Sequence, residues 1–82
     1  MILMSGMSIL TSTAQARTFD SSSAIFSAQK RLQAKGYFRG PVNGRLNSRT
    51  RRALRNFQSD NKLAQTGRLN LKTCIMLGAS CK

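Results

Sequence analysis

The sequence predicts an all-α fold, a compact three-helix bundle that contains two repeated turn-and-helix units. Three observations support this prediction. Apolar residues recur at helical spacing in three segments, each segment follows a residue of the N-cap type, and a six-residue pattern occurs twice at an offset of 23 residues. The 82 residues allow one small domain with a thin core, which depends on additional stabilisation such as a crosslink.

The first sixteen residues form an apolar, uncharged segment that ends in Ala14-Gln15-Ala16. A short apolar run followed by a small-x-small pattern is typical of a secretory signal peptide, so we expect residues 1–16 to be cleaved off after Ala16. The alternative is the frayed apolar N-terminus of a cytosolic protein. The segment is too short to cross a membrane as a helix. Residues 17–23 are polar and are expected to form a flexible lead-in.

The first helix is expected to begin near Asp20 or the serines at 21–23, which are all good N-cap types. Gly36 should end this helix as a C′ glycine, and Tyr37 should then contact Leu32 across the end of the helix. Three residues at i, i+3 and i+7 form its apolar stripe: Ile25, Ala28 and Leu32.

The second helix follows two turn signals, Gly40-Pro41 and Asn43-Gly44, and is expected to be capped by Asn47 or Ser48. Asp60-Asn61 should close it. Four residues form its apolar stripe: Thr50, Ala53, Leu54 and Phe57. Three basic residues fall on the opposite face: Arg51, Arg52 and Arg55.

The third helix is short, from about Leu71 to Leu77, with Asn70 as its cap and Gly78 as its end. The repeat supports this assignment, because both copies read Gly-Arg-Leu-Asn followed by a Thr and a Leu at the same positions. The copies are Gly44-Arg45-Leu46-Asn47 with Thr50 and Leu54, and Gly67-Arg68-Leu69-Asn70 with Thr73 and Leu77. The predicted domain therefore spans residues 24–78, with a tail at 79–82.

The composition excludes several classes of enzyme. The chain has no His, which removes Ser-His and Cys-His nucleophile systems and His-bearing zinc sites. Two cysteines are too few for a cysteine-only metal site. Asp20 and Asp60 are the only carboxylate side chains, and nothing else supports a glycosidase that uses two of them. We therefore expect a protein that is not an enzyme and that has no metal and no cofactor.

Cys74 and Cys81 flank Gly78 at the end of the chain. An exported protein meets an oxidising compartment, where an even number of cysteines fits one bridge. A turn at Gly78 can bring the two residues within disulfide distance, so we expect an intramolecular disulfide. The alternatives are two free thiols or an intermolecular bridge.

Fourteen basic residues give the chain a net charge of +12, which implies an anionic partner or surface. Arg49, Arg51 and Arg52 crowd the start of the second helix, where positive charge opposes the helix dipole. No acidic residue within four positions offsets them. This pattern favours an anion-binding face over a merely solvated basic surface.

From Ala28 to Leu77 the sequence resembles the three-helix type of peptidoglycan-binding domain. The resemblance implies a helical fold that binds cell-wall glycopeptide without catalysis by the module itself. It is carried by an ordered set of small motifs: Ala28-Gln29 with Leu32, Gly36-Tyr37, Gly40-Pro41-Val42-Asn43-Gly44, Thr50, Ala53-Leu54, Phe57-Gln58, Leu63, Thr66-Gly67, Leu69 and Thr73 to Leu77.

The chain departs from the pattern of that family in three ways. Asn43 stands where the family commonly has Asp before the loop glycine, and Ala28 stands where a larger apolar residue is usual. The family's module is usually attached to a catalytic domain, for which these 82 residues leave no room.

We expect most of the matched residues to be structural, with Gln58 bonding a loop backbone and Tyr37 packing with its hydroxyl outward. Phe38 is the preferred residue for stacking on a ligand, since the cap contact already uses Tyr37. The candidate ligand-binding residues are Phe38, Arg39, Asn43, Arg45, Arg51, Arg52, Arg55 and Arg68. Arginine can bind the free carboxylates of peptidoglycan peptides in a bidentate manner.

These features predict a small periplasmic or secreted module, expected to be a monomer, that binds peptidoglycan alone or beside a separate wall hydrolase. A nucleic-acid-binding protein is the first alternative, although the long connection from Asp60 to Asn70 does not suit a helix-turn-helix reader. The second is a cationic protein that binds lipopolysaccharide or a membrane surface, although the apolar stripe of its Arg-bearing helix is needed for the fold.

Overall fold

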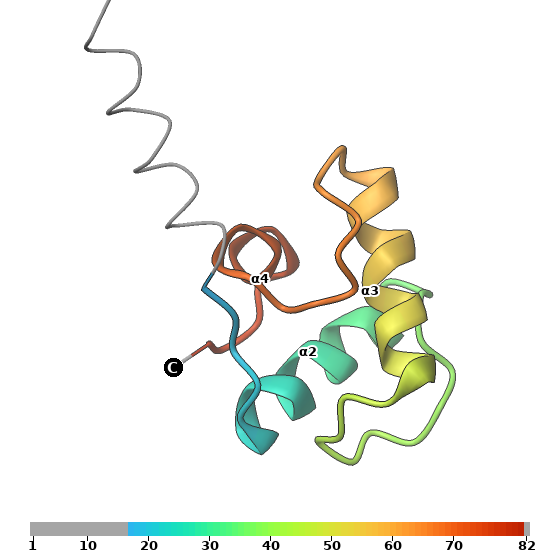
Figure 1. Cartoon of the computed structure of the whole chain (residues 1–82). Coiled ribbons are helices and arrows are strands. Elements are labelled where there is room, and N and C mark those ends of the chain that lie inside the picture. The colour runs from blue at the N-terminus through green and yellow to red at the C-terminus, as the bar shows by residue number, and fades with distance from the viewer. Residues whose placement is uncertain (1–16, 82) are drawn as a thin grey trace, which may run out of the picture.

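The computed structural model describes residues 17–81 and places three helices in that part of the chain (Figure 1). They are α2 (Ser22–Ala34), α3 (Ser48–Asp60) and α4 (Leu71–Leu77). No strand occurs among these residues, although an isolated antiparallel bridge joins Thr18 to Asn70. The predicted three-helix architecture is confirmed. The expected signal segment, residues 1–16, lies outside the described residues.

Each helix begins at a side chain that accepts a hydrogen bond from a backbone N–H of the first turn. Ser21 accepts from Ala24 (3.2 Å), Asn47 from Thr50 (3.0 Å) and Asn70 from Thr73 (2.9 Å). These bonds satisfy N–H groups that have no partner inside the helix. All three caps fall where the sequence predicted them, and α2 begins two residues before the predicted domain boundary at 24.

The three helices also end in the same way, with one residue in the left-handed conformation. In α2 the N–H of Gly36 donates to Gln33 (3.1 Å) and the N–H of Tyr37 donates to Leu32 (2.8 Å), which is a Schellman motif. Gly78 has the same role in α4, as expected. In α3 the left-handed residue is Lys62 (φ 58°), which the sequence did not indicate because no glycine marks the position.

The core lies between the helices, with α2 packed against both α3 and α4. The Leu side chains of the predicted stripes are fully buried, and Val42, Leu46 and Leu63 pack against the core from the connecting loops. Within the described part of the chain, eleven apolar residues make up the core: Ala24, Ile25, Ala28, Leu32, Phe38, Ala53, Leu54, Phe57, Leu69, Cys74 and Leu77.

The segment before α2 is attached to the domain, contrary to the expected flexible lead-in. The N–H of Phe19 donates to the carbonyl of Leu69 (2.8 Å), and the Phe19 side chain packs against the core. The extended chain here pairs with the backbone just before α4. An apolar side chain two residues ahead of the cap supplies the reason, because it gains contacts by lying on the core.

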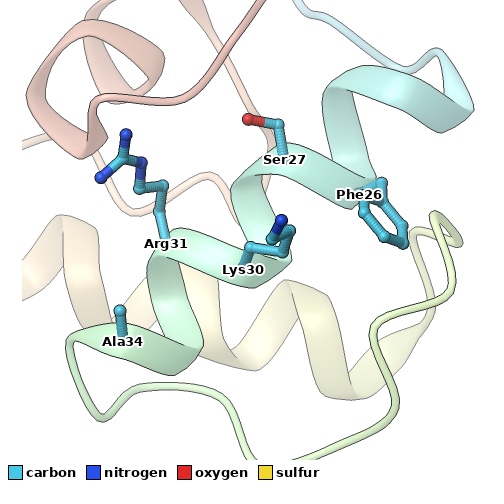
Figure 2. Close-up of a pocket in the computed structure, with 5 residues that line it drawn as sticks. All are labelled: Phe26, Ser27, Lys30, Arg31 and Ala34. Carbon is cyan, nitrogen blue, oxygen red and sulfur yellow. The ribbon is translucent and has the colours of Figure 1, made fainter.

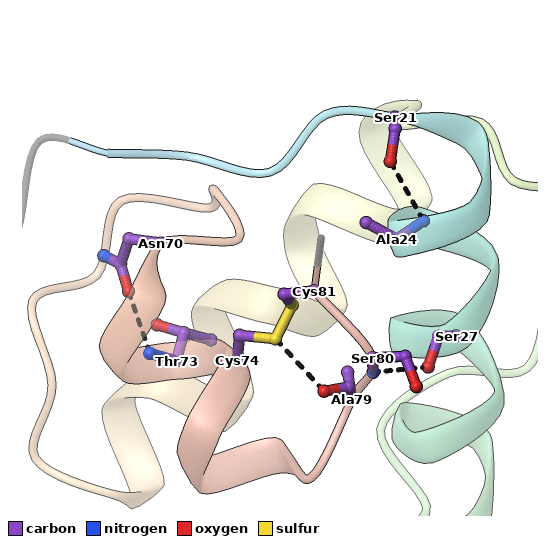
Figure 3. The surroundings of a disulfide bond; sticks show 9 residues. All are labelled: Ser21, Ala24, Ser27, Asn70, Thr73, Cys74, Ala79, Ser80 and Cys81. Atoms are coloured by element: carbon purple, nitrogen blue, oxygen red, sulfur yellow. Dashed lines mark hydrogen bonds between the residues drawn. A yellow bond between two sulfur atoms is a disulfide. The ribbon is translucent and has the colours of Figure 1, made fainter.

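The tail after α4 is held at two points (Figure 3). Cys74 and Cys81 form the predicted intramolecular disulfide, with their Cα atoms 6.4 Å apart. The N–H of Ser80 donates to Ser27 Oγ on α2 (2.8 Å). The tail therefore returns from α4 to the surface of α2.

Candidate functional site

Two buried glutamines position the loops that carry the candidate binding residues. Gln29 of α2 accepts hydrogen bonds from the N–H groups of Asn43 (3.0 Å) and Gly44 (2.8 Å) through Oε1. Its Nε2 donates to the carbonyl of Arg45 (3.0 Å) and to Thr50 Oγ1 (2.9 Å). One fully buried amide thus connects α2, the 43–45 turn and the first turn of α3.

Gln58 of α3 forms the same connection to the second repeat. Its Oε1 accepts from the N–H of Gly67 (2.9 Å), and its Nε2 donates to the carbonyl of Arg68 (2.9 Å) and to Thr73 Oγ1 (3.1 Å). The expected bond from Gln58 to a loop backbone is confirmed. Gly44 and Gly67 both have positive φ, and a Cβ at Gly44 would lie 2.8 Å from the carbonyl oxygen of Ser22.

The consequence for the site is that Arg45 and Arg68 occupy equivalent positions. Each follows the turn glycine and turns its backbone carbonyl inward to a glutamine, while its side chain is exposed. Arg39 is exposed as well, on the connection that precedes the first turn. These three predicted residues are therefore available to a ligand.

Asn43 is exposed, but its side-chain oxygen is already engaged within the loop. Oδ1 accepts from the N–H of Arg45 (3.0 Å) and from Gln29 Nε2 (3.3 Å), which closes an Asx turn. An Asp at this position could accept the same bonds, so the departure from the family pattern preserves the turn. The Asn43 carboxamide NH₂ is the part that remains free for a ligand.

The arginines of α3 are all exposed, as predicted, but they differ in their surroundings. The Arg55 side chain lies along the turn at Gly67, because a Cβ added to that glycine would come within 2.9 Å of the guanidinium. Arg49 lies in the same way over Gly40. Arg49 and Arg52 line, with Ser48, a hollow of about 190 Å³ at the start of α3.

The prediction that Phe38 stacks on a ligand is wrong, because its ring is only 2% exposed and belongs to the core. The turn at Gly36 directs two successive aromatic residues back over the helices, so both are used in packing. Tyr37 packs edge-on against Phe57, with ring centroids 5.5 Å apart. Neither ring is therefore free to stack on a ligand.

The exposed aromatic residue is Phe26 of α2, which was not among the predicted site residues. Its side chain is 44% exposed, and Lys30 Nζ lies 5.8 Å from its ring centroid. A signal was present, since Phe26 falls beside the Ile25 stripe and shares a face with Lys30, four residues later. Phe26 therefore presents an aromatic ring to solvent beside a basic side chain.

The two carboxylates interact with hydroxyl groups. Tyr37 Oη donates to Asp60 Oδ2 (2.6 Å), and Thr18 Oγ1 donates to Asp20 Oδ2 (3.4 Å). The bond to Asp60, with desolvation and the nearby negative charge, raises the pKa of Tyr37. Within residues 17–81 no cluster of three His, Cys, Asp or Glu side chains could hold a metal ion.

The comparisons with known proteins agree with this geometry. A family model described as "Putative peptidoglycan binding domain" matches residues 21–77, from the N-cap of α2 to the last residue of α4. A solved structure titled "The crystal structure of SleB N-terminal domain" is similar, with a TM-score of 0.68 and 35% sequence identity. That match covers 76% of this chain and 84% of the other. No curated protein matches the chain.

Proposed function

The chain belongs to the peptidoglycan-binding domain family, and from this membership we propose that it binds bacterial cell-wall peptidoglycan without catalysis of its own. The observation that carries the proposal is the extent of the family match, which includes all three helices and both glutamine-held loops. A separate wall hydrolase would supply any catalytic activity, with this chain as a monomeric targeting module. Neither match supports nucleic-acid or membrane binding.

The charge of the chain suits this polymer. Peptidoglycan peptides carry free carboxylates, and the described surface presents exposed arginines on α3 and on both loops. At the start of α3 the helix dipole and the arginines are both positive, so an anion there would relieve their mutual repulsion. We propose that Arg51 and Arg52 supply much of the electrostatic attraction, and that Arg39, Arg45 and Arg68 add to it.

We further propose that the protein is exported to the periplasm or secreted after cleavage following Ala16. The support is the apolar segment ending in Ala14-Gln15-Ala16 and the disulfide between Cys74 and Cys81, which needs an oxidising compartment. Among residues 17–81 no helix has both the length and the apolar character to span a bilayer. Mass spectrometry of the native protein should find a chain that begins at Arg17, and an intact cytosolic chain would contradict export.

The test of binding is co-sedimentation with purified sacculi at low and moderate salt, with DNA and anionic vesicles as competitors. We expect retention on sacculi that weakens with salt, because exposed charges are screened beyond about 8 Å at physiological ionic strength. Preferential capture by DNA or vesicles would contradict the proposal.

A matched pair of variants tests the arginines of α3. Arg51→Gln with Arg52→Gln should weaken retention and leave the fold intact, since both side chains are exposed. The control variant, Arg17→Gln with Lys35→Gln, removes two positive charges outside α3 and should weaken retention less. We leave Arg55 unchanged because it lies against Gly67. Equal retention by the two double variants would show that only net charge matters.

A further inference from the structure

A second surface, separate from the α3 arginines, contains a groove on the exposed face of α2 (Figure 2). Its volume is about 450 Å³, and it is open to solvent. Figure 2 shows α3 behind α2, so the groove opens on the side of α2 that faces away from α3. Five residues from three successive turns line it: Phe26, Ser27, Lys30, Arg31 and Ala34.

The groove contains an aromatic ring that has no part in the core. Of the four Phe residues, Phe38 and Phe57 are in the core and Phe19 packs against it, whereas Phe26 does neither. Its ring is 44% exposed and is not part of the core cluster. A half-exposed ring beside a lysine offers an apolar, planar surface to a ligand.

The polar groups of the groove are hydrogen-bond donors. Lys30 and Arg31 have only donors, and no carboxylate lines the groove. Ser27 Oγ already accepts a hydrogen bond from the N–H of Ser80, so its own proton is available to a ligand. This set of groups is complementary to an anion rich in acceptors that also has an apolar face.

The tail lies beside this site. The bond from Ser80 to Ser27 places the disulfide-held tail along one side of the groove, and Arg31 Nε lies 3.9 Å from where a Cβ of Gly78 would be. Arg31 is thus positioned between α2 and the turn after α4. The residues that line the groove all belong to α2, and the tail lies next to it at Ser27.

We infer that the α2 groove binds one repeating unit of the peptidoglycan, a sugar that carries a short peptide. The apolar face of the sugar stacks on Phe26, and a peptide carboxylate is bound by Lys30 and Arg31. This inference rests on the proposed function and adds a specific contact to the general attraction of the α3 arginines.

The experiment is an NMR titration of the ¹⁵N-labelled chain with a disaccharide–tetrapeptide fragment. The largest shift changes should occur at the amides of residues 26–34. Phe26→Ala should weaken binding about fivefold to tenfold, from the loss of a stacking contact of roughly 1 kcal/mol. Ile75→Ala, which removes a side chain that is 69% exposed on α4, should leave the affinity unchanged.

The carboxylate contact has its own test. Lys30→Gln with Arg31→Gln should weaken binding of the free-acid fragment but not of the same fragment with its carboxylates amidated. The Phe26→Ala variant and the Lys30→Gln, Arg31→Gln variant should both melt like the parent protein, because these three side chains are exposed. Unchanged affinity in a folded Phe26→Ala protein, or shifts confined to α3 and its loops, would overturn the inference and leave the proposed function standing. A parent chain that fails to bind sacculi would instead refute the proposed function.

Discussion

Lys62 ends α3 in a backbone conformation that glycine occupies at the ends of α2 and α4. Its φ is 58°, while Gly36 and Gly78 have φ of 86° and 78°. An L-residue in this region brings its Cβ close to the following carbonyl oxygen. The motif forms nevertheless, because the N–H of Leu63 donates to the carbonyl of Gln58 (2.8 Å) and its side chain packs on the core.

We expect Lys62→Gly to raise the free energy of unfolding by about 1 kcal/mol, since glycine has no Cβ to strain the left-handed conformation. Urea denaturation of the two proteins measures the change. Lys62→Ala is the control, because it removes the long side chain but keeps the Cβ. If the alanine variant gained as much as the glycine variant, the lysine side chain and not the backbone would be responsible.

Tyr37 links the end of α2 to α3 through its ring contact with Phe57 and its hydroxyl bond to Asp60. That bond raises the pKa of Tyr37 above its ordinary value of 10.0. The folded protein therefore holds the phenol proton more tightly than the unfolded chain does. The resulting stabilisation is complete below about pH 10 and is lost as the pH rises through the higher pKa of the folded state.

Tyr37→Phe should accordingly remove part of the alkaline loss of stability. We expect the difference in unfolding free energy between parent and variant to shrink as the pH rises above 10. Since the chain has one tyrosine, its tyrosinate absorbance reports the ionisation directly. A midpoint of titration at or below that of a free tyrosine would contradict the raised pKa.

At the scale of the elements, the two glutamines explain how a short chain holds two irregular loops. Gln29 and Gln58 each bind a turn glycine, the carbonyl of the following arginine and the hydroxyl of a helix threonine. Buried backbone groups need partners, and here one side chain supplies them for each loop. The loops that carry Arg45 and Arg68 are thereby fixed to the helices.

Gln58→Met keeps the approximate shape of the side chain but removes its hydrogen bonds. The N–H of Gly67 and the carbonyl of Arg68 would lose their partners, at about 1–3 kcal/mol for each buried group. We expect the unfolding free energy to fall by at least about 2 kcal/mol, and Gln29→Met to act similarly. Gln33→Met is the control: it changes an exposed glutamine of α2 and should alter the unfolding free energy by no more than about 0.5 kcal/mol. Similar losses at Gln33 and Gln58 would contradict the structural role of Gln58.

At the scale of the whole molecule, a small core and a high positive charge act against stability. Like charges repel in the compact state, and the eleven buried apolar residues found within residues 17–81 provide a thin core. The disulfide offsets part of this, because it constrains the unfolded chain between residues 74 and 81. It also retains the tail beside the α2 groove.

Reduction of the disulfide should lower the free energy of unfolding by about 2–3 kcal/mol, the loop-closure entropy of a short loop. Thermal melts with and without reductant measure it. In a Cys81→Ala variant the reductant should have no further effect, which separates the bridge from any other action of the reagent. An equal melting temperature for reduced and oxidised parent would show that the bridge contributes nothing to stability.

The local features of this protein were determined by the sequence itself. Caps and helix lengths could be predicted because they depend on residues three or four positions apart, and the disulfide because only two cysteines exist. The arginines of α3 were correctly placed on the exposed face for the same reason, since helical periodicity assigns faces.

Only the tertiary structure decided which side chains the loops would bury. Phe38 or Tyr37 could each have faced solvent after Gly36, and the packing of both left Phe26 as the exposed ring. The same holds for the lead-in at Phe19 and the tail at Ser80, whose partners Leu69 and Ser27 are about fifty residues away. Such contacts depend on how three helices meet in space, and no short-range pattern in the sequence encodes that meeting.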